Sequence, residues 1–312
     1  MLSAFPLELQ SILREKIKGK RICLPEGQDE RVVQAASILQ KDFLAKVILG
    51  GPHFAQQHKE TTQKALQARG KEERFASLQE DIHCAAGGLL AAGEVDAVVS
   101  GCNAPTSQVL RAALFTVGTS HKLLTSCFMM IFPTPSPGGE EIFLFGDCAV
   151  IPEPTAEQLT QIGFLMKDAF ACWTTKQPRV GFLSFSTAGS ADHPATQKVS
   201  QAARLFREQN PNVPSPGYEV QFDAAIVPEV AQRKCPGDLS MPGNANVLVF
   251  PNLDAGNIAY KLAQRMGHAA AYGPILLGAR KPFSDLSRGA SVEDIVHTSV
   301  LTCALANSSM SG

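Results

Sequence analysis

Apolar residues in this chain form short uninterrupted runs that alternate with segments in which they recur every three or four positions. The runs at 21–24 (RICL), 46–49 (KVIL) and 95–101 (VDAVVSG) predict strands, and the periodic segments between them predict helices. Strands that are apolar throughout are typical of parallel sheets covered on both faces. The pattern therefore predicts an α/β fold with mostly parallel sheets flanked by helices.

The same alternation continues to the end of the chain across one Pro/Gly-rich loop, PTPSPGGE, at residues 133–140. Loops of this composition are common at domain boundaries, and 312 residues suffice for two domains. The closing helix from Ser291 is the last element and needs a partner, so we expect it to return to the first domain. The expected domains are 1–139 plus 290–312, and 140–289.

Three segments beyond these strands carry expectations that a structure can check. Residues 55–74 are polar and predict a helix with exposed faces. Residues 222–233 predict one helix, and GNIAYKLAQRM, from Gly256, predicts another. Thr155, followed by Ala156, Glu157 and Gln158, has the pattern of a helix N-cap.

A candidate anion site lies in KPFSDLSRGASVEDIV, where Ser287, Arg288 and Gly289 come just before a helix start. A hydroxyl, a guanidinium and the free N–H groups of a first helical turn are the donors that bind phosphate. Ser291 and Asp294 also fit a capping box that satisfies only its own helix end. Both interpretations stay open on these residues alone.

Polar residues also follow the strand at 95–101, in the loop GCNAPTSQVLR. Open α/β sheets bind ligands at the carboxyl ends of their strands, which favours Asn103 and Thr106 as binding residues, with Arg111 one turn into the next helix. The structural alternative is that Thr106 or Ser107 caps that helix.

Four further candidates stand near predicted strand ends or helix starts: Cys148, Ser186, Asn257 and Lys261. Each also has a structural interpretation. Cys148 fits a small buried hydrophobic residue, Ser186 a turn residue and Lys261 a solvated helix lysine.

Composition excludes several functional classes. The formal net charge is −1, which argues against a nucleic-acid surface, and no run of about 18 apolar residues predicts a membrane span. The eight cysteines are scattered singly, which suits reduced thiols in a cytoplasmic protein. Dinucleotide, P-loop and GxSxG motifs are absent, and no carboxylate cluster predicts a metal site.

Six segments of the chain carry a combined pattern. In chain order they are LPEGQDERVVQAA, FGDCAVIPEPTAEQL, LSFSTAGSADHP, EVQFDAAIVPEV, NVLVFPNLDAGNIAYKLAQR and GPILLGARKPFSDLSRGASVEDIV. Together they resemble the phosphate acetyltransferase family. The resemblance covers nearly the whole chain, and the combination of motifs is more specific than any one of them. SGCNAPTSQVLRAAL is closer to the shorter, ethanolamine-utilisation type.

The resemblance implies a two-domain fold similar to isocitrate and isopropylmalate dehydrogenases, with an interdomain cleft and usually a homodimer. It implies an acyltransferase of acetate metabolism that catalyses acetyl-CoA + phosphate ⇌ acetyl phosphate + CoA. Coenzyme A is then a substrate, and neither a metal nor a tightly bound cofactor is expected. Ser287 and Arg288 would bind the phosphoryl group, Arg111 would be a second cationic contact, and Asp294 would deprotonate the CoA thiol.

Direct attack by the CoA thiolate in a ternary complex is favoured over a covalent acyl intermediate on Cys148. The chain departs from the family pattern at 103–105, at Ala259, where glycine is common, and at Leu277, where glutamine is common. Three alternatives therefore stay open: a phosphate butyryl- or propionyltransferase, a decarboxylating dehydrogenase of the same fold, and a catalytically weak protein that binds CoA or acyl phosphate. The dehydrogenase is disfavoured by the missing metal-binding carboxylates.

Overall fold

The structure of the chain, a computed structural model, describes residues 5–120, 123–238, 240 and 242–307. It comprises two compact units, the first formed by Met1–Leu124 and Gly273–Gly312 and the second by Thr125–Tyr272. These boundaries differ from the expected ones. The Pro/Gly-rich loop at 133–140 joins two antiparallel strands of the second unit, β4 and β5, and β9 belongs to the sheet of the first unit.

The first unit is built on a four-stranded sheet in the order β2-β1-β3-β9. All three strand pairings are parallel, as the apolar runs predict. Strand β9 is three residues long and was not predicted, because it lies inside a segment read for its polar residues. The strands are β1 (Arg21–Leu24), β2 (Lys46–Leu49), β3 (Ala97–Ser100) and β9 (Phe283–Asp285).

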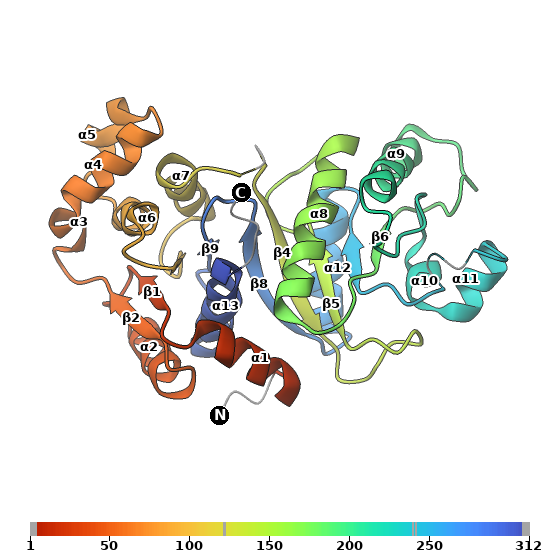
Figure 1. Cartoon of the computed structure of the whole chain (residues 1–312), viewed down its shortest axis with the longest axis horizontal. Helices are drawn as coiled ribbons and strands as arrows, with labels where there is room; N and C mark the ends of the chain where they lie inside the picture. Colours follow the sequence, from red (N-terminus) through yellow and green to blue (C-terminus); the bar gives the residue numbers. More distant parts are fainter. Residues whose placement is uncertain (1–4, 121–122, 239, 241, 308–312) are drawn as a thin grey trace. The chain divides into compact units, whose positions relative to one another are not determined.

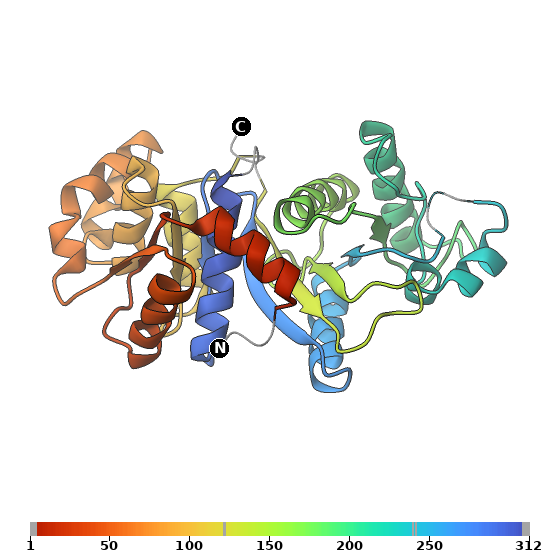
Figure 2. The ribbon, with the colours of Figure 1, turned by 60° about the horizontal axis from the view of Figure 1, so that its bottom comes forward.

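Helices cover both faces of this sheet (Figure 1). On one face α2 packs against α13, and α1 crosses and packs against α13 although the two helices are far apart in the sequence (Figure 2). On the other face α6 packs between α4 and α7. The helices are α1 (Leu7–Ile17), α2 (Glu30–Asp42), α4 (Lys59–Ala68), α6 (Ile82–Ala92), α7 (Thr106–Thr116) and α13 (Val292–Ala304), with shorter α3 (Phe54–Gln57), η1 (Glu72–Arg74), α5 (Phe75–Leu78) and η2 (Leu305–Asn307).

A five-stranded sheet in the order β6-β7-β5-β4-β8 lies mainly in the second unit, and the boundary between the units, at Gly273, falls within β8. The β4–β5 pair is antiparallel, whereas β7 is parallel to both β5 and β6. Helices α8 and α9 pack together, and α12 packs on β4 and β5. The elements are β4 (Thr125–Ile131), β5 (Ile142–Gly146), α8 (Ala156–Trp173), β6 (Val180–Phe182), α9 (Pro194–Gln209), α10 (Phe222–Ile226), α11 (Pro228–Lys234), β7 (Val247–Val249), α12 (Leu253–Arg265) and β8 (Ala270–Leu277).

Three predicted helices differ from the observed ones. The helix expected over 55–74 is broken into α3, α4 and the 3-10 turn η1, and Gly70 lies between the last two with a positive φ. The helix expected over 222–233 is interrupted before Pro228, whose ring cannot follow a residue in helical conformation without strain. Helix α12 starts three residues before Gly256, because the side chain of Asn252 accepts the N–H of Ala255.

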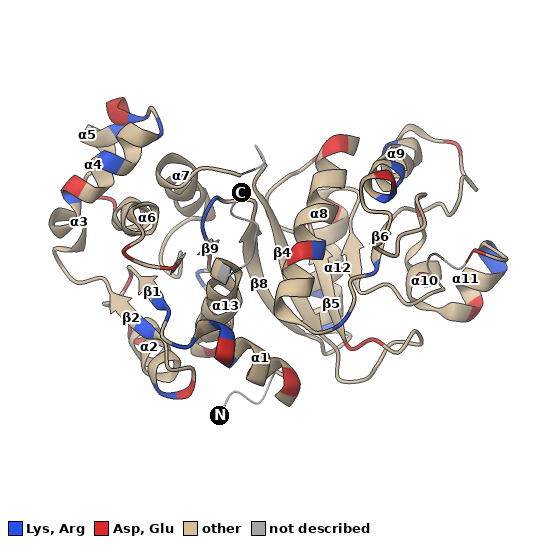
Figure 3. Ribbon diagram, viewed as in Figure 1, with Lys and Arg blue, Asp and Glu red and all other residues tan. Residues whose placement is uncertain are grey.

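Charged residues of both signs alternate along the ribbon (Figure 3). This distribution agrees with the formal net charge of −1. Of the helices in the described residues, none has both the length and the apolar character needed to cross a bilayer.

The N-terminus of α8 provides a stability prediction. Thr155 is exposed, and its hydroxyl accepts the N–H of Gln158 while the Gln158 side chain accepts the N–H of Thr155. Replacing Thr155 by alanine leaves the N–H of Gln158 without its partner, so we expect Thr155→Ala to lower the free energy of unfolding by about 1 kcal/mol. Urea denaturation measures this change. Thr155→Ser keeps the capping oxygen and is the control, and equal losses in both variants would contradict the role of the cap.

Candidate active site

Three loops meet at the carboxyl edge of the first sheet. Strands β1, β3 and β9 are parallel neighbours, so the segments that follow them emerge at the same edge. These segments are Pro25–Asp29, Gly101–Pro105 and Leu286–Ser291. They contain Asn103, Ser287 and Arg288, which the sequence singles out from widely separated parts of the chain.

Glu26 organises the loop after β3. Its side chain is only 8% exposed, and its carboxylate accepts the backbone N–H groups of Gly101 at 2.7 Å, Cys102 at 3.0 Å and Asn103 at 2.8 Å. A carboxylate has acceptor sites for all three of these bonds, which together satisfy most of its hydrogen-bonding capacity after burial. Glu26 therefore fixes the backbone from which Asn103 projects. The sequence interpretation missed this residue.

Arg31 connects the loops after β1 and β9. Its guanidinium bonds to the Asp29 carboxylate at 2.8 and 3.0 Å, and donates from Nη1 to the carbonyl oxygens of Arg288 at 3.1 Å and Ala290 at 2.9 Å. The hydrogen bond from Arg31 holds the pKa of Asp29 well below its usual range. Arg31 was also not predicted, although its place two residues after the cap of α2 was visible in the sequence.

The turn at 287–289 presents an exposed cation. Ser287 and Arg288 are both exposed, and the Ser287 hydroxyl accepts the N–H of Gly289 at 3.3 Å. Within the described residues, the guanidinium of Arg288 has neither an ion pair nor a hydrogen bond. Since Arg31 holds the backbone of this turn, the Arg288 side chain is left available for an anion in solution.

Asp294 forms the capping box at the start of α13. Its Oδ2 accepts the N–H and the hydroxyl of Ser291, both at 2.9 Å, and Ser291 Oγ accepts the N–H of Asp294 at 3.1 Å. The structural interpretation of this pair is thus confirmed. It does not exclude a second role, because the carboxylate is only half-buried and no hydrogen bond to Oδ1 is formed within the described residues.

Two expected binding residues are held by carboxylates. The Asn103 side chain donates to Asp29 at 2.9 Å. Thr106 does not cap α7, whose N-cap residue is Pro105; its hydroxyl instead donates to Asp285 at 2.6 Å. The Thr106 cap considered from sequence is therefore wrong.

Arg111 is exposed on α7 and pairs loosely with Asp81, at 3.8 Å. Asp81 caps α6 through the N–H groups of His83 and Cys84 and accepts a bond from Gln108. Because this carboxylate already has several partners, the contact leaves the Arg111 guanidinium free to bind other groups.

Asp285 is a third residue that the sequence interpretation left out of the site. It ends β9, is 1% exposed, and its Oδ1 has no hydrogen-bond partner in the described part of the chain. Burial raises the pKa of this carboxyl to about 7, against the opposing effect of the Thr106 hydrogen bond. A period-based analysis cannot identify such a residue, because its burial depends on how β9 pairs with β3.

The remaining candidates lie in the second unit. Cys148 is fully buried, and burial raises the pKa of its thiol well above the usual value. The Asn257 side chain donates to the Cys148 carbonyl at 3.0 Å. Ser186 is buried and donates to Glu219 at 2.7 Å, while Lys261 is exposed with its ammonium 5.7 Å from the Tyr260 ring centroid. The structure brings Cys148 and Asn257 together; the substrate-binding roles expected for these residues stay predictions.

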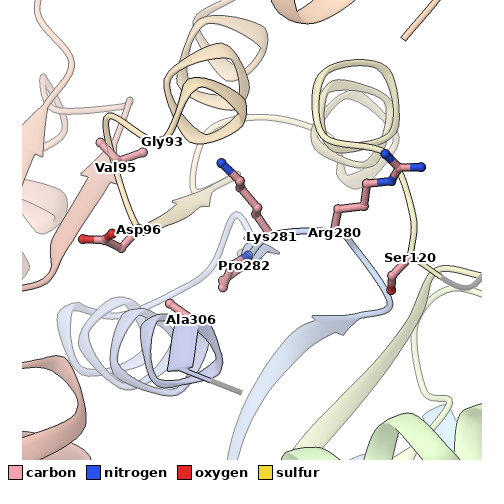
Figure 4. Close-up of a pocket in the computed structure, with 8 residues that line it drawn as sticks. All are labelled: Gly93, Val95, Asp96, Ser120, Arg280, Lys281, Pro282 and Ala306. Atoms are coloured by element: carbon pink, nitrogen blue, oxygen red, sulfur yellow. The ribbon is translucent and has the colours of Figure 1, made fainter. Parts of the chain in front are cut away.

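A pocket of about 570 Å³ lies in the first unit but away from these loops (Figure 4). It borders the residues that precede β3 and β9, which is the amino edge of the sheet. Its charged groups all have partners within the unit. Asp96 pairs with Arg21, Lys281 donates to carbonyls in the last turn of α6, and Arg280 donates to the Thr119 carbonyl. The pocket contains none of the expected site residues.

A larger cavity of about 800 Å³, in the second unit, has mostly apolar walls and includes Ala259. No group of three or more His, Cys, Asp or Glu side chains in the described ranges is arranged to hold a metal ion.

Comparison with known proteins gives one consistent result. Residues 9–74 and 65–303 match the family described as Phosphate acetyl/butaryl transferase. A phosphate acetyltransferase of Acetivibrio thermocellus is 38% identical, with 94% of this chain and 96% of that protein covered. The EutD phosphotransacetylase from Staphylococcus aureus is 34% identical over 96% of this chain and 98% of that one, with a TM-score of 0.83. A phosphotransacetylase from Streptococcus pyogenes is 33% identical over 97% and 99%, with a TM-score of 0.86.

The fold and the exposed cationic turn define an α/β protein of two units with donors for an anion at a sheet edge. The chain belongs to the phosphate acetyl/butaryl transferase family.

The role assigned to Glu26 can be tested by removing its charge. In Glu26→Gln an amide replaces a buried carboxylate that accepts three N–H groups, so we expect the free energy of unfolding to fall by about 2 kcal/mol. Chemical denaturation measures the change. Glu30→Gln, four residues on and exposed, is the matched control, and similar stability of both variants would contradict the role.

Proposed function

We propose that this chain is a phosphate acetyltransferase that interconverts acetyl-CoA plus phosphate with acetyl phosphate plus CoA. The observation that carries the proposal is the Ser287–Arg288 turn, whose backbone Arg31 holds while the Arg288 side chain stays exposed. Family membership over nearly the full chain supports the same reaction.

Phosphate binding follows from the chemistry of the turn. A guanidinium is permanently charged, and its planar fork matches two phosphate oxygens. The Ser287 hydroxyl can donate a further hydrogen bond, and the exposed Arg111 offers a second positive charge. As the acyl–oxygen bond of acetyl phosphate breaks, negative charge grows on the departing phosphate, so these contacts strengthen towards the transition state.

The nucleophile in the proposed mechanism is the CoA thiolate. Asp294 takes the thiol proton, the sulfur attacks the carbonyl carbon, and the carbon–oxygen bond to phosphate breaks with the electron pair leaving on phosphate. The reverse reaction returns the proton to sulfur. Since Ser291 occupies only Oδ2 of Asp294, Oδ1 can accept the proton while the capping box stays formed.

A covalent intermediate on Cys148 is disfavoured. A thiol attacks as its thiolate, and a fully buried Cys148 with a strongly raised pKa holds its proton at neutral pH. Direct transfer in a ternary complex needs no acyl-cysteine.

The proposal includes a cytoplasmic homodimer with no tightly bound cofactor and with CoA as substrate. Seven of the eight free cysteines are buried, which suits a reducing compartment. Sedimentation of the purified protein measures the assembly.

The reaction is tested by following thioester absorbance with CoA and a panel of acyl phosphates. Acetyl phosphate should give the highest kcat/KM, because that is the proposed substrate. A preference for butyryl or propionyl phosphate would change the assigned acyl group. CoA binding without any thioester formation would refute the proposal that the protein is an enzyme.

Arg288 provides the first residue-level prediction. We expect Arg288→Ala to lower kcat by about 100- to 1,000-fold, since it removes a charge that stabilises the departing phosphate. Steady-state kinetics with CoA and acetyl phosphate measure the loss. Arg280→Ala, an exposed arginine at the opposite edge of the sheet, is the control. Near-normal turnover of Arg288→Ala would remove Arg288 from the mechanism.

Asp294 provides the second, because its two roles make different predictions. As a base, Asp294→Asn should lower kcat by about 100-fold or more while the amide oxygen still caps α13 and Tm changes little. Ser291→Ala breaks the cap and keeps the base, so it should lower stability by about 1 kcal/mol and retain turnover. The base assignment fails if Asp294→Asn chiefly lowers Tm, or if both variants lose turnover alike.

A further inference from the structure

Asp285 lies between the two elements that carry the proposed phosphate contacts. It precedes Ser287 by two residues, and the N–H of Leu286 donates to the Ser100 carbonyl at 2.8 Å, which aligns the end of β9 with the end of β3. On its other side the carboxyl accepts the Thr106 hydroxyl at 2.6 Å, at the first residue of the helix that carries Arg111.

The carboxyl approaches the backbone of Gly101 closely. A Cβ built on Gly101 would lie 2.4 Å from Asp285 Oδ1, nearer than two such atoms can come. Gly101 also has φ +111°, a conformation that other residues rarely adopt. A glycine at this position therefore gives Asp285 room to reach Thr106.

The position of Asp285 is costly for folding. The side chain is 1% exposed, Oδ1 has no hydrogen-bond partner among the described residues, and the Glu26 carboxylate repels further negative charge. Glu26, from the loop after β1, is the charged group that acts on it, and α7 contributes the uncharged Thr106 hydroxyl. A buried carboxyl that destabilises the fold beside a binding turn indicates a functional role.

We propose that Asp285 is a positioning residue for the phosphate substrate: through Thr106 it joins the Ser287–Arg288 turn to the start of the helix that carries Arg111. The inference rests on the proposed function. It assigns Thr106 to supporting Asp285, whereas the sequence interpretation places it against substrate. It also makes the charge of Asp285 relevant to binding, since an ionised carboxyl so near the turn opposes a phosphate dianion.

The pH dependence follows with a definite sign. Burial raises the pKa of Asp285 to about 7, so the group is neutral below that pH and negative above it. The KM for acetyl phosphate should therefore rise as pH increases through 7. Asp285→Asn keeps the shape and stays neutral, so this rise should be reduced. Because the folded pKa exceeds the unfolded one, Asp285 costs stability increasingly from about pH 4 to 7, and Asp285→Asn should be at least as stable as the wild type at pH 8.

The test compares Asp285→Asn, Thr106→Val and the double variant with the control Thr62→Val. Thr62 is buried in α4 and its hydroxyl bonds only within its own helix. We expect Thr106→Val to raise the KM for acetyl phosphate about five- to tenfold, the change that loss of one hydrogen bond gives, with the KM for CoA unchanged. The double variant should be no worse than the worse single variant, because both remove one interaction.

Each outcome decides the inference. An unchanged KM for acetyl phosphate in Thr106→Val, or an equal rise for CoA, overturns it, as does a pH profile of Asp285→Asn that matches the wild type. If Asp285→Asn does not fold, Thr106→Val and its control still decide. A wild-type protein without acetyl transfer overturns the proposed function and the inference with it, whereas an active wild type with unaffected variants overturns the inference alone.

Discussion

The candidate site depends on the guanidinium of Arg31. One planar group bonds to the Asp29 carboxylate and to the carbonyls of Arg288 and Ala290, so it ties the loop after β1 to the loop after β9. Both loops are short, and neither has a hydrophobic core of its own to fix its conformation. The Arg31 guanidinium, which is rigid and bonds to both loops, fixes their conformation in place of such a core. The neighbouring Glu26 does the same for the loop after β3 with three backbone bonds.

Two buried carboxyl groups at the carboxyl edge of the first sheet have very different hydrogen-bond partners. Glu26 is surrounded by N–H donors, which stabilise an anion, whereas Asp285 has the Thr106 hydroxyl and an oxygen without a partner. The carboxyl groups of Glu26 and Asp285 have similar intrinsic pKa values, but the two environments at this sheet edge differ. Such differences are how proteins give identical functional groups distinct roles.

Much of the fold could be predicted from the sequence. Short apolar runs identify β1, β2 and β3, and the cap at Thr155 is visible as a local pattern. What could not be predicted depends on pairing. Strand β9 is three residues long and is recognisable only beside β3, and the Pro/Gly-rich loop resembles a linker until β4 and β5 are seen to form an antiparallel pair. The same limit applies to the site: Arg288 and Ser287 are prominent in a motif, but Glu26, Arg31 and Asp285 acquire their meaning from residues about 70 to 260 positions away.

The order of the segments along the chain has a consequence for synthesis. The first unit contains residues from both ends of the chain, and its sheet receives β9 only after the entire second unit has been made. During synthesis on the ribosome, the edge of β3 that will pair with β9 therefore stays unpaired, and the sheet surface that α13 will cover stays exposed to solvent. The turn that bears Arg288 also follows the second unit along the chain, so a nascent chain acquires its anion-binding edge only after that unit has been made.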